Sequence, residues 1–428
     1  GPDVVVGQLR GERAYGGEGG VSAFSFGYTV CNLGDEPVEY VANTNEHPII
    51  THNLYRLSNG RFEQIGMSWV THEFLALALN QCDAGCLDPG TGALLGVGCS
   101  VSNSSGVAGV QSIFAPRSPI NAHTGDFPYP WSAPSPAATI GRRLQVHNSD
   151  LDPALNGGAV YFVEGQIIAP DDSTAGNQNN NASYRPVEIT FTEAESRYEA
   201  MLIESTRVGQ AAIRAWRAQD PSVVETEIQV PGEGFLILAA KATDLKDGMW
   251  RYEYALQNVN SDRSVRSFAI PLPHDARVDN IGFHDVDYHS GDPFDPADWT
   301  ALLTEVSISW STNYYQVDLD ANALRWGTLY NFRFDARACP GSTAVSLELF
   351  KPGVPTSITV TTTGPETGNV GDFTEDCVLD LRDLNAFTTC LAGPGVEFPA
   401  PCMAADFNND ARIDLEDVAA LQVTFAGP

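Results

Sequence analysis

Basic side chains are scarce in this 428-residue sequence. Lysine and arginine together number 24 against 54 aspartates and glutamates, which leaves a formal net charge of -30. A chain this acidic is repelled by phosphate backbones and anionic lipid, which argues against nucleic-acid and membrane-surface binding. Long apolar runs are missing too, because no stretch approaches the roughly 20 residues of a membrane span. Cations, neutral polymers and basic proteins remain as partners.

The signatures of several large enzyme classes are also missing. The sequence has no G-x-S-x-G, which disfavours an α/β-hydrolase, and no Rossmann or P-loop glycine pattern after a strand, which disfavours nucleotide cofactors. It has no H-x-H or H-E-x-x-H motif. Any metal site in the body of the protein must therefore be argued from the placement of its histidines.

Cysteines are present in an even number and in two local groups. The members are Cys31, Cys82, Cys86, Cys99, Cys339, Cys377, Cys390 and Cys402. This distribution predicts two sets of disulfides, with the pairing left open except that Cys390 and Cys402 are placed to bridge across a local insertion. A zinc site from Cys82, Cys86 and Cys99 is the competing interpretation. It is disfavoured because tight C-x2-C pairs and a nearby histidine are missing.

Disulfides predict an extracytoplasmic protein, either secreted or at the cell surface. The chain begins at Gly1-Pro2 without a methionine, which indicates a processed terminus or an expression remnant. No signal peptide is visible, so the prediction of export rests on the cysteines.

Short runs of β-branched and aromatic residues recur between the 39 glycines and 27 prolines. In Trp250–Leu256 the alternate residues Trp250, Tyr252, Tyr254 and Leu256 share one face, as in a half-buried strand. The other clear runs are Gly158–Ile168, Gly234–Ala240, Val265–Leu272 and Ser307–Trp310. The pattern predicts a mainly β fold with two β-sandwich-like domains plus a small helical module.

The same patterning suggests four segments. We expect a β-rich N-terminal domain over residues 1–210, a β-sandwich over 211–352, an extended linker over 353–370 and a helical module over 371–428. Helix signals in the body are few, and they predict helices at Met67–Gln81 and Ala211–Arg217.

The tail contains a duplicated pattern of oxygen-bearing side chains. Two segments place them at positions one, three, five, nine and twelve, with a backbone carbonyl expected at position seven, and each is followed by an apolar helix-like run. The first set is Asp372, Thr374, Asp376, Val378, Asp380 and Asp383, and the second is Asp406, Asn408, Asp410, Arg412, Asp414 and Asp417. Calcium takes six to eight oxygens at this spacing in a twelve-residue loop, so the sequence predicts two calcium ions in the tail.

This duplicated loop–helix pattern resembles a type I dockerin, the module that binds cohesin domains in cellulosomes. The usual glycine at position six is replaced by Cys377 in one loop and Ala411 in the other, and the segment Ala392–Pro401 is longer than typical. The resemblance implies a cohesin-like partner. Its contacts would fall near Leu381, Arg382, Leu415 and Glu416.

All eight histidines lie in the body. His47, His72 and His147 of the first domain are candidates for a three-histidine site with an open position, which is the arrangement of a catalytic metal centre. The alternative is a set of hydrogen-bonded or exposed histidines without a metal. If a metal is bound, copper or zinc is expected.

A second polar cluster lies in the second domain, at His284, Asp285, Asp287 and His289. On a strand, Asp285, Asp287 and His289 would share a face, which suits a mixed zinc or iron site. The following loop, with Asp292, Asp295 and Asp298, suits either calcium or plain turn formation.

The body segments Asn53–Arg56, Arg61–Trp69 and Asn322–Phe334 resemble secreted multidomain bacterial proteins of unknown function, which implies export and a β-rich modular body. Two functions follow from these patterns. The first is a secreted copper- or zinc-dependent oxidoreductase or hydrolase that acts on an extracellular polymer, with polysaccharide the expected polymer, and that is attached through the tail. The second is a non-catalytic carbohydrate-binding, adhesion or cell-envelope protein.

Overall fold

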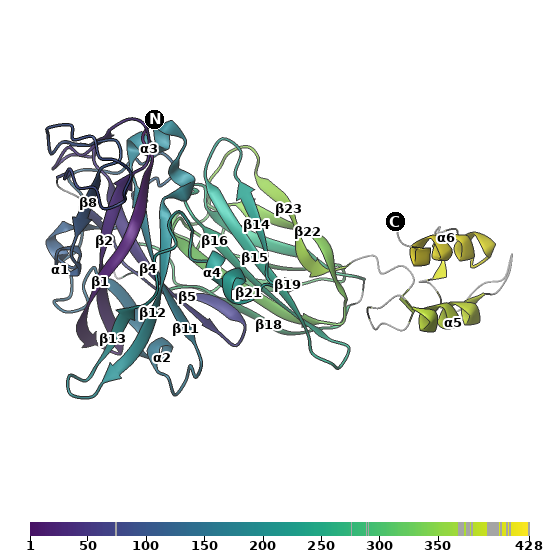
Figure 1. Ribbon diagram of the computed structural model, residues 1–428. Coiled ribbons are helices and arrows are strands. Elements are labelled where there is room, and N and C mark those ends of the chain that lie inside the picture. Colours follow the sequence, from purple (N-terminus) through teal and green to yellow (C-terminus); the bar gives the residue numbers. More distant parts are fainter. Residues whose placement is uncertain are drawn as a thin grey trace.

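The computed structural model describes residues 1–72, 75–274, 276–287, 289, 291–366, 372–373, 377, 380–391, 402, 405–407, 410 and 412–426. It confirms the mainly β fold. Two β units lie side by side, and a pair of helices stands beyond the second unit (Figure 1). No helix of the described residues is long and apolar enough to cross a membrane.

The first unit is built on one eleven-stranded sheet in the order β1-β2-β10-β5-β4-β11-β12-β13, with β6, β8 and β9 attached beside this path. The main strands are β1 (Val4–Glu18), β2 (Val21–Asn32), β4 (Ile49–Ser58), β5 (Arg61–Met67), β10 (Leu144–His147), β11 (Val160–Ile168), β12 (Ala182–Thr192) and β13 (Arg197–Leu202). The attached strands are β6 (Val70–His72), β8 (Ser100–Asn103) and β9 (Phe114–Ala115), and a separate pair is β3 (Val38–Glu39) with β7 (Leu94–Leu95).

This sheet curls so that its two ends enclose one core. Leu9 of β1, Phe24 of β2, Leu54 of β4, Val163 of β11 and Ala200 of β13 are all buried in the same cluster. The short helical turns lie in its connections, at α1 (Ser105–Ala108), η1 (Gln111–Ile113), α2 (Asn148–Leu151), α3 (Pro170–Ala175) and η2 (Gln178–Asn180).

The second unit is a β-sandwich of two five-stranded sheets, in the orders β14-β15-β16-β21-β18 and β19-β20-β17-β22-β23. Trp250 is half-buried and Tyr252, Tyr254 and Leu256 are buried on the inner face of β16, which confirms that they share a face. The strand is not half-buried as expected, because Ala255 and Gln257 of its other face are also buried. The strands are β14 (Val224–Gln229), β15 (Phe235–Asp244), β16 (Trp250–Asn258), β17 (Val265–Pro271), β18 (Val278–His284), β19 (Thr300–Leu303), β20 (Ser307–Ser311), β21 (Thr328–Ala336), β22 (Pro340–Leu349) and β23 (Ser357–Pro365).

Two local predictions are corrected. The helix expected over Met67–Gln81 is absent from its described part, where Val70–His72 forms β6 and pairs with β4 and β9. The linker expected over 353–370 contains β23, whose Ser357–Pro365 pairs along β22, so the second sandwich continues past residue 352. The short helix expected near Ala211–Arg217 is present as α4 (Arg214–Gln219).

The two β units share a buried interface. Tyr55, Phe62 and Phe162 of the first unit pack in one cluster with residues that include Trp216 of α4 and Leu329 of β21. Burial of this kind stabilises an assembly by roughly 25 cal/mol for each Å² of apolar surface removed from water. The two units therefore form one body.

The tail consists of α5 (Leu381–Cys390) and α6 (Leu415–Ala426), packed through Phe387, Ile413 and Leu421. A disulfide between Cys390 and Cys402 closes its insertion, as the sequence predicted. The other disulfides join Cys31 to Cys82, Cys86 to Cys99 and Cys339 to Cys377. The alternative of a zinc site at Cys82, Cys86 and Cys99 is therefore wrong. Four disulfides are typical of a protein from an oxidising compartment.

Candidate functional site

The first predicted metal ligands, His47 and His72, are brought together but enclosed. His72 Nδ1 lies 3.4 Å from His47 Nε2, and His47 Nδ1 lies 2.9 Å from the Pro48 carbonyl oxygen. The His72 ring stacks on Trp131 with centroids 4.1 Å apart, and Phe127 meets both imidazoles edge-on. Burial lowers the pKa of His47, and it lowers the pKa of His72 to about 3, so His72 is neutral at physiological pH.

His147 takes a different partner. Its Nε2 lies 2.7 Å from Asp287 Oδ2, and both side chains are at least half exposed. In the described part of the chain, metal-ligating atoms converge at Cys339, Asp372 and Cys377, of which the two cysteines are joined by a disulfide. None of the body histidines in that part belongs to such a convergent group. The structure thus pairs His47 with His72 and does not add His147 as a third ligand.

The second predicted cluster is dispersed, because β18 ends at His284 and the residues after it leave the strand. His284 Nε2 lies 3.3 Å from the Gln64 carbonyl oxygen, and Asp285 accepts a hydrogen bond from Asn322 Nδ2 at 2.5 Å. His289 Nε2 lies 2.9 Å from the Arg143 carbonyl oxygen. Burial raises the pKa of Asp285 to about 6.

Some of these residues instead meet in a cleft of about 410 Å³ between the two β units. One wall comes from β5 and β10 and carries His147, and the other comes from the loop after β18. That second wall includes Asp287, His289, Asp292 and Phe294. Ligand sites commonly lie at such domain boundaries, where convergent polar groups meet an apolar surface.

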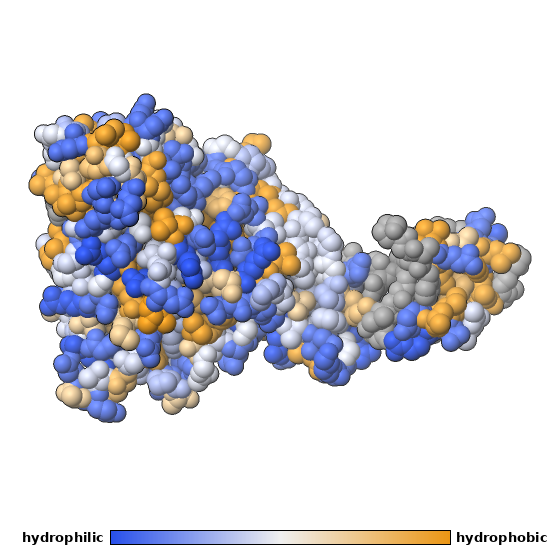
Figure 2. All heavy atoms as spheres, viewed as in Figure 1, coloured by the Kyte–Doolittle hydropathy of each residue, from blue (hydrophilic) through white to orange (hydrophobic). Residues whose placement is uncertain are grey.

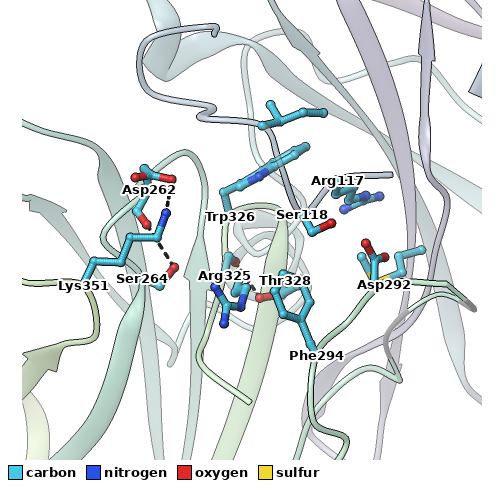
Figure 3. Close-up of a pocket in the computed structure, with 12 residues that line it drawn as sticks. Arg117, Ser118, Asp262, Ser264, Asp292, Phe294, Arg325, Trp326, Thr328 and Lys351 are labelled. Carbon is cyan, nitrogen blue, oxygen red and sulfur yellow. Dashed lines mark hydrogen bonds and ion pairs between the residues drawn. The ribbon is translucent and has the colours of Figure 1, made fainter. Parts of the chain in front are cut away.

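Asp292 also lines a narrower pocket beside this cleft, where it lies next to Arg117 (Figure 3). Burial raises the pKa of Asp292 to about 6, although the Arg117 charge opposes that shift. At the other end of the pocket Lys351 Nζ bonds Asp262 at 2.7 Å. Arg117, at the same end as Asp292, gave no sequence signal, because a single arginine between Pro116 and Ser118 matches no motif.

Arg117 is buried, and burial lowers its pKa to about 10. It donates hydrogen bonds to the carbonyl oxygens of Ser68 and His52 in the first unit and of Gly327 in the second. The hydrogen-bond donors of Arg117 thus connect the two units and fix their relative position. Asp292, His147 and Asp287 are the groups of the cleft that remain suited to proton transfer or ligand binding.

The two halves of the tail share one hydrogen-bond pattern at the start of their helices. The backbone N–H of Asp380 donates to Asp383 at 2.8 Å, and that of Asp414 donates to Asp417 at 2.8 Å. The next turn repeats as well, with Arg382 N–H donating to Asp380 at 2.7 Å and Glu416 N–H donating to Asp414 at 2.9 Å. The aspartates at position twelve, Asp383 and Asp417, are both fully buried.

The first positions of the loops are also held in place. Asp372 accepts a hydrogen bond from Cys377 N–H at 2.8 Å, and Asp406 accepts one from Asp410 N–H at 3.1 Å. Arg412, whose carbonyl is the predicted seventh ligand of the second loop, donates its N–H to Asp410 at 2.9 Å. The predicted ligands Thr374, Asp376, Val378 and Asn408 lie outside the described residues.

Comparisons with known proteins give no family for this chain. No protein-family model matches it, and no curated protein does. Among solved structures, it is similar to a serine-rich repeat adhesion glycoprotein from Streptococcus agalactiae at 8% identity, with 86% of this chain and 99% of that chain covered and a TM-score of 0.21.

Two further similarities are equally remote. The N-terminal domain of an adhesin from Streptococcus gordonii is 7% identical over 85% of this chain and 98% of that chain, with a TM-score of 0.19. An exo-chitosanase from Amycolatopsis orientalis is 12% identical over 79% of this chain and 25% of that chain, with a TM-score of 0.17. At such scores these likenesses carry no argument about function.

Proposed function

We propose that the chain is an extracellular attachment protein, secreted or held at the cell surface, whose tail binds two calcium ions and whose body binds polysaccharide. The observation that carries the proposal is the repeated hydrogen-bond pattern at Asp380–Asp383 and Asp414–Asp417. It supports calcium binding because the carboxylates at positions nine and twelve are oriented alike in both halves, at the loop spacing that calcium requires.

The tail also offers a docking surface. Leu381 and Leu415 hold equivalent positions at the start of the two helices and are 71% and 81% exposed. Figure 2 shows hydrophobic surface over the two helices. Exposed apolar side chains at matching positions support a protein partner, which the resemblance to dockerins identifies as a cohesin-like domain.

Calcium titration of the full chain tests this function. After removal of divalent ions, calorimetry should report two calcium ions per chain. Asp383→Ala and Asp417→Ala should each lose one of them, because each removes the ligand that closes one loop. Asp320→Ala, an exposed position of the second sandwich, is the matched control and should keep both ions. Two ions retained in both tail variants would reject the proposal.

A second candidate function is that of a metal-dependent enzyme, with the interdomain cleft as its active site. The supporting observation is that Asp292, whose pKa is raised, lines the same cavity as the His147–Asp287 pair. Carboxyl groups in unlike environments are suited to acid and base roles. Copper or zinc held by the His147–Asp287 pair, with water or substrate completing the coordination, would add Lewis-acid or redox chemistry.

Elemental analysis decides between the two functions. The sample is the full chain with Asp383→Ala and Asp417→Ala, because a truncation near residue 353 would remove β23 from its sheet. One copper or zinc per chain, lost on His147→Ala and kept on His274→Ala, would make a metal-dependent enzyme the working model and direct assays to oxidation or hydrolysis. No transition metal after copper and zinc are added back would leave the body as a binding unit.

A further inference from the structure

A broad groove of about 510 Å³ lies on the first unit and shares no lining residue with the interdomain cleft. One side is formed by β1 and the turn after α1, and the other by the loop before β10. Its walls include Arg13, Tyr15, Gln111, Pro136, Ala138 and Arg143.

Two arginines face one aromatic ring in this groove. The guanidinium carbons of Arg13 and Arg143 lie 4.9 Å and 3.6 Å from the centroid of the Tyr15 ring. Cation–π contacts of this length hold a guanidinium in place without neutralising it. Tyr15 is itself anchored, because its hydroxyl lies 3.0 Å from Ser25 Oγ.

The positive charge of the groove is not balanced by ion pairs. Among the described residues, no carboxylate lies within ion-pair distance of Arg13, Arg142 or Arg143. Arg143 donates to the carbonyl oxygens of Gly109 and Thr139, which are neutral acceptors. Arg142, the next residue, donates to the carbonyl oxygens of Gln111, Phe114 and Pro134.

The absence of counter-charges is unexpected in a chain with 54 acidic and 24 basic side chains. Some other arginines are paired, as Arg61 is with Glu253 at 2.9 Å and Arg251 with Asp335 at 2.8 Å, whereas the buried Arg117 bonds neutral acceptors. The pKa of Arg143 is lowered by burial and further by the neighbouring Arg13 charge, while contact with Tyr15 opposes the shift. Two like charges held close together repel each other, and a bound anion would relieve that repulsion.

The loop that forms the far wall is held firmly. Gln111 Nε2 donates to the carbonyl oxygens of Ala137 and Ala138 at 3.0 Å and 2.9 Å. The groove is therefore shaped before any ligand arrives, which reduces the ordering cost of binding.

The net charge of -30 disfavours polyanions over most of the surface, but among the described residues the arginines of this groove have no carboxylate partner. We propose that this groove binds the carboxylate or sulfate groups of an acidic polysaccharide, with Arg13 as the residue that contacts the anion. A guanidinium matches both anions with two parallel hydrogen bonds. An open groove of this size admits a sugar ring within a longer polymer. The proposal rests on the proposed function only in taking polysaccharide as the ligand of the body, and it is independent of calcium.

Binding of the full chain to immobilised polymers tests the proposal at about 50 mM salt, where exposed charges are screened little. The probes are polygalacturonate for carboxylate, dextran sulfate for sulfate and dextran as the neutral control. We expect binding to at least one polyanion and none to dextran. Arg13→Gln should weaken it about tenfold, because one charge-assisted contact is lost.

Arg10→Gln is the matched control. Arg10 lies on the same strand and donates to Gln81 and Ser102 at 3.1 Å and 3.4 Å, outside the groove. It should leave binding within about twofold, since the loss of diffuse attraction alone is small. Equal losses in the two variants would mean diffuse attraction and overturn the proposal. So would no binding to either polyanion, or binding to polyglutamate in preference to both.

Calcium titration of the same samples distinguishes a failure of the groove proposal from a failure of the tail proposal. Chelation of calcium, or Asp383→Ala with Asp417→Ala, should leave polyanion binding unchanged. If the tail binds calcium and no polyanion binds, only the groove proposal fails. If polyanion binding depends on Arg13 and the tail takes no calcium, only the tail proposal fails.

Discussion

Cys377 is bonded through its sulfur to Cys339, which joins the sixth position of the first tail loop to the connection between β21 and β22 of the second sandwich. Cys377 has a φ of 65°, the left-handed conformation that glycine adopts most readily. Its N–H still donates to Asp372. The bridge therefore ties Cys377, a non-glycine residue in the left-handed region, to the body.

We predict that this bridge supports calcium binding in the first loop. In a chain that also carries Asp417→Ala, the pair Cys339→Ser and Cys377→Ser should weaken calcium binding about fivefold, because a non-glycine residue in the left-handed region costs about 1 kcal/mol when nothing holds it there. Cys339→Ser with Cys377→Gly should recover most of the loss. Calorimetry measures both. Equal affinity in the two double variants would show that the strained position does not matter.

We predict that Glu164 holds the two β units together. Its carboxylate is buried and accepts hydrogen bonds from Tyr55 at 2.9 Å, Gln257 at 3.0 Å and the Ala212 N–H at 2.6 Å. Glu164→Ala leaves these donors without an acceptor, so the free energy of unfolding should fall by about 3–5 kcal/mol. Thermal unfolding measures this loss.

The exposed Glu188→Ala of β12 is the control for that measurement and should change stability by less than about 0.5 kcal/mol. Because Gln257 belongs to the second unit and Tyr55 to the first, the Glu164 variant should also change how the units unfold. A wild type that unfolds in one transition and a variant that unfolds in two would fit this role. An unchanged midpoint would contradict it.

The sequence predicted the elements whose local pattern agrees with their packing. The alternation in Trp250–Leu256 was sufficient because β16 has β15 and β21 as neighbours and buries one face in the sandwich core. The helix expected at Met67–Gln81 is wrong because Val70–His72 is fixed by pairing with residues near Ile49 and Phe114, which a local window does not contain.

The strand β23 was missed because its local pattern is weak. Its outward residues are serines and threonines, so the hydrophobic alternation is weak, and its register comes from β22. Long-range pairing also separates the three candidate histidines, since β6 pairs with β4 and brings His72 to His47, whereas β10 carries His147 to Asp287. Residue types indicated candidate ligands, but long-range pairing decided which of them meet.

We predict that Asp172 lowers stability as the pH rises. It is buried, accepts hydrogen bonds from Val4 N–H at 2.9 Å and Asn181 Nδ2 at 2.8 Å, and burial raises its pKa from 3.8 to about 7. The folded state thus holds a proton that the unfolded state has released. Its contribution is fully present below about pH 4 and is lost as the pH rises to about 7.

Asp172→Asn tests this linkage, because the amide is isosteric and an Asn181 flip can offer its unpartnered Oδ1 as an acceptor. Relative to the wild type, the variant should gain on the order of 3 kcal/mol between pH 4 and pH 8. Denaturant unfolding at the two pH values measures the gain. The exposed Asp320→Asn should show none, and a constant difference between Asp172→Asn and the wild type would contradict the prediction.

We predict the opposite pH dependence for His52. It is buried beside Phe26 and Tyr28, its Nε2 has no hydrogen-bond partner among the residues that the structure describes, and burial lowers its pKa to about 3. The unfolded state therefore binds a proton at His52 that the folded state does not bind, so the free energy of unfolding falls as the pH drops from about 6.5 to about 3.

His52→Leu removes this pH dependence, and the leucine suits the apolar surroundings. At pH 5 the variant should gain about 2 kcal/mol more over the wild type than at pH 8, measured by denaturant unfolding, with the exposed His274→Leu as control. A gain of equal size at both pH values would mean that packing alone improved, and that His52 is not held neutral by its burial.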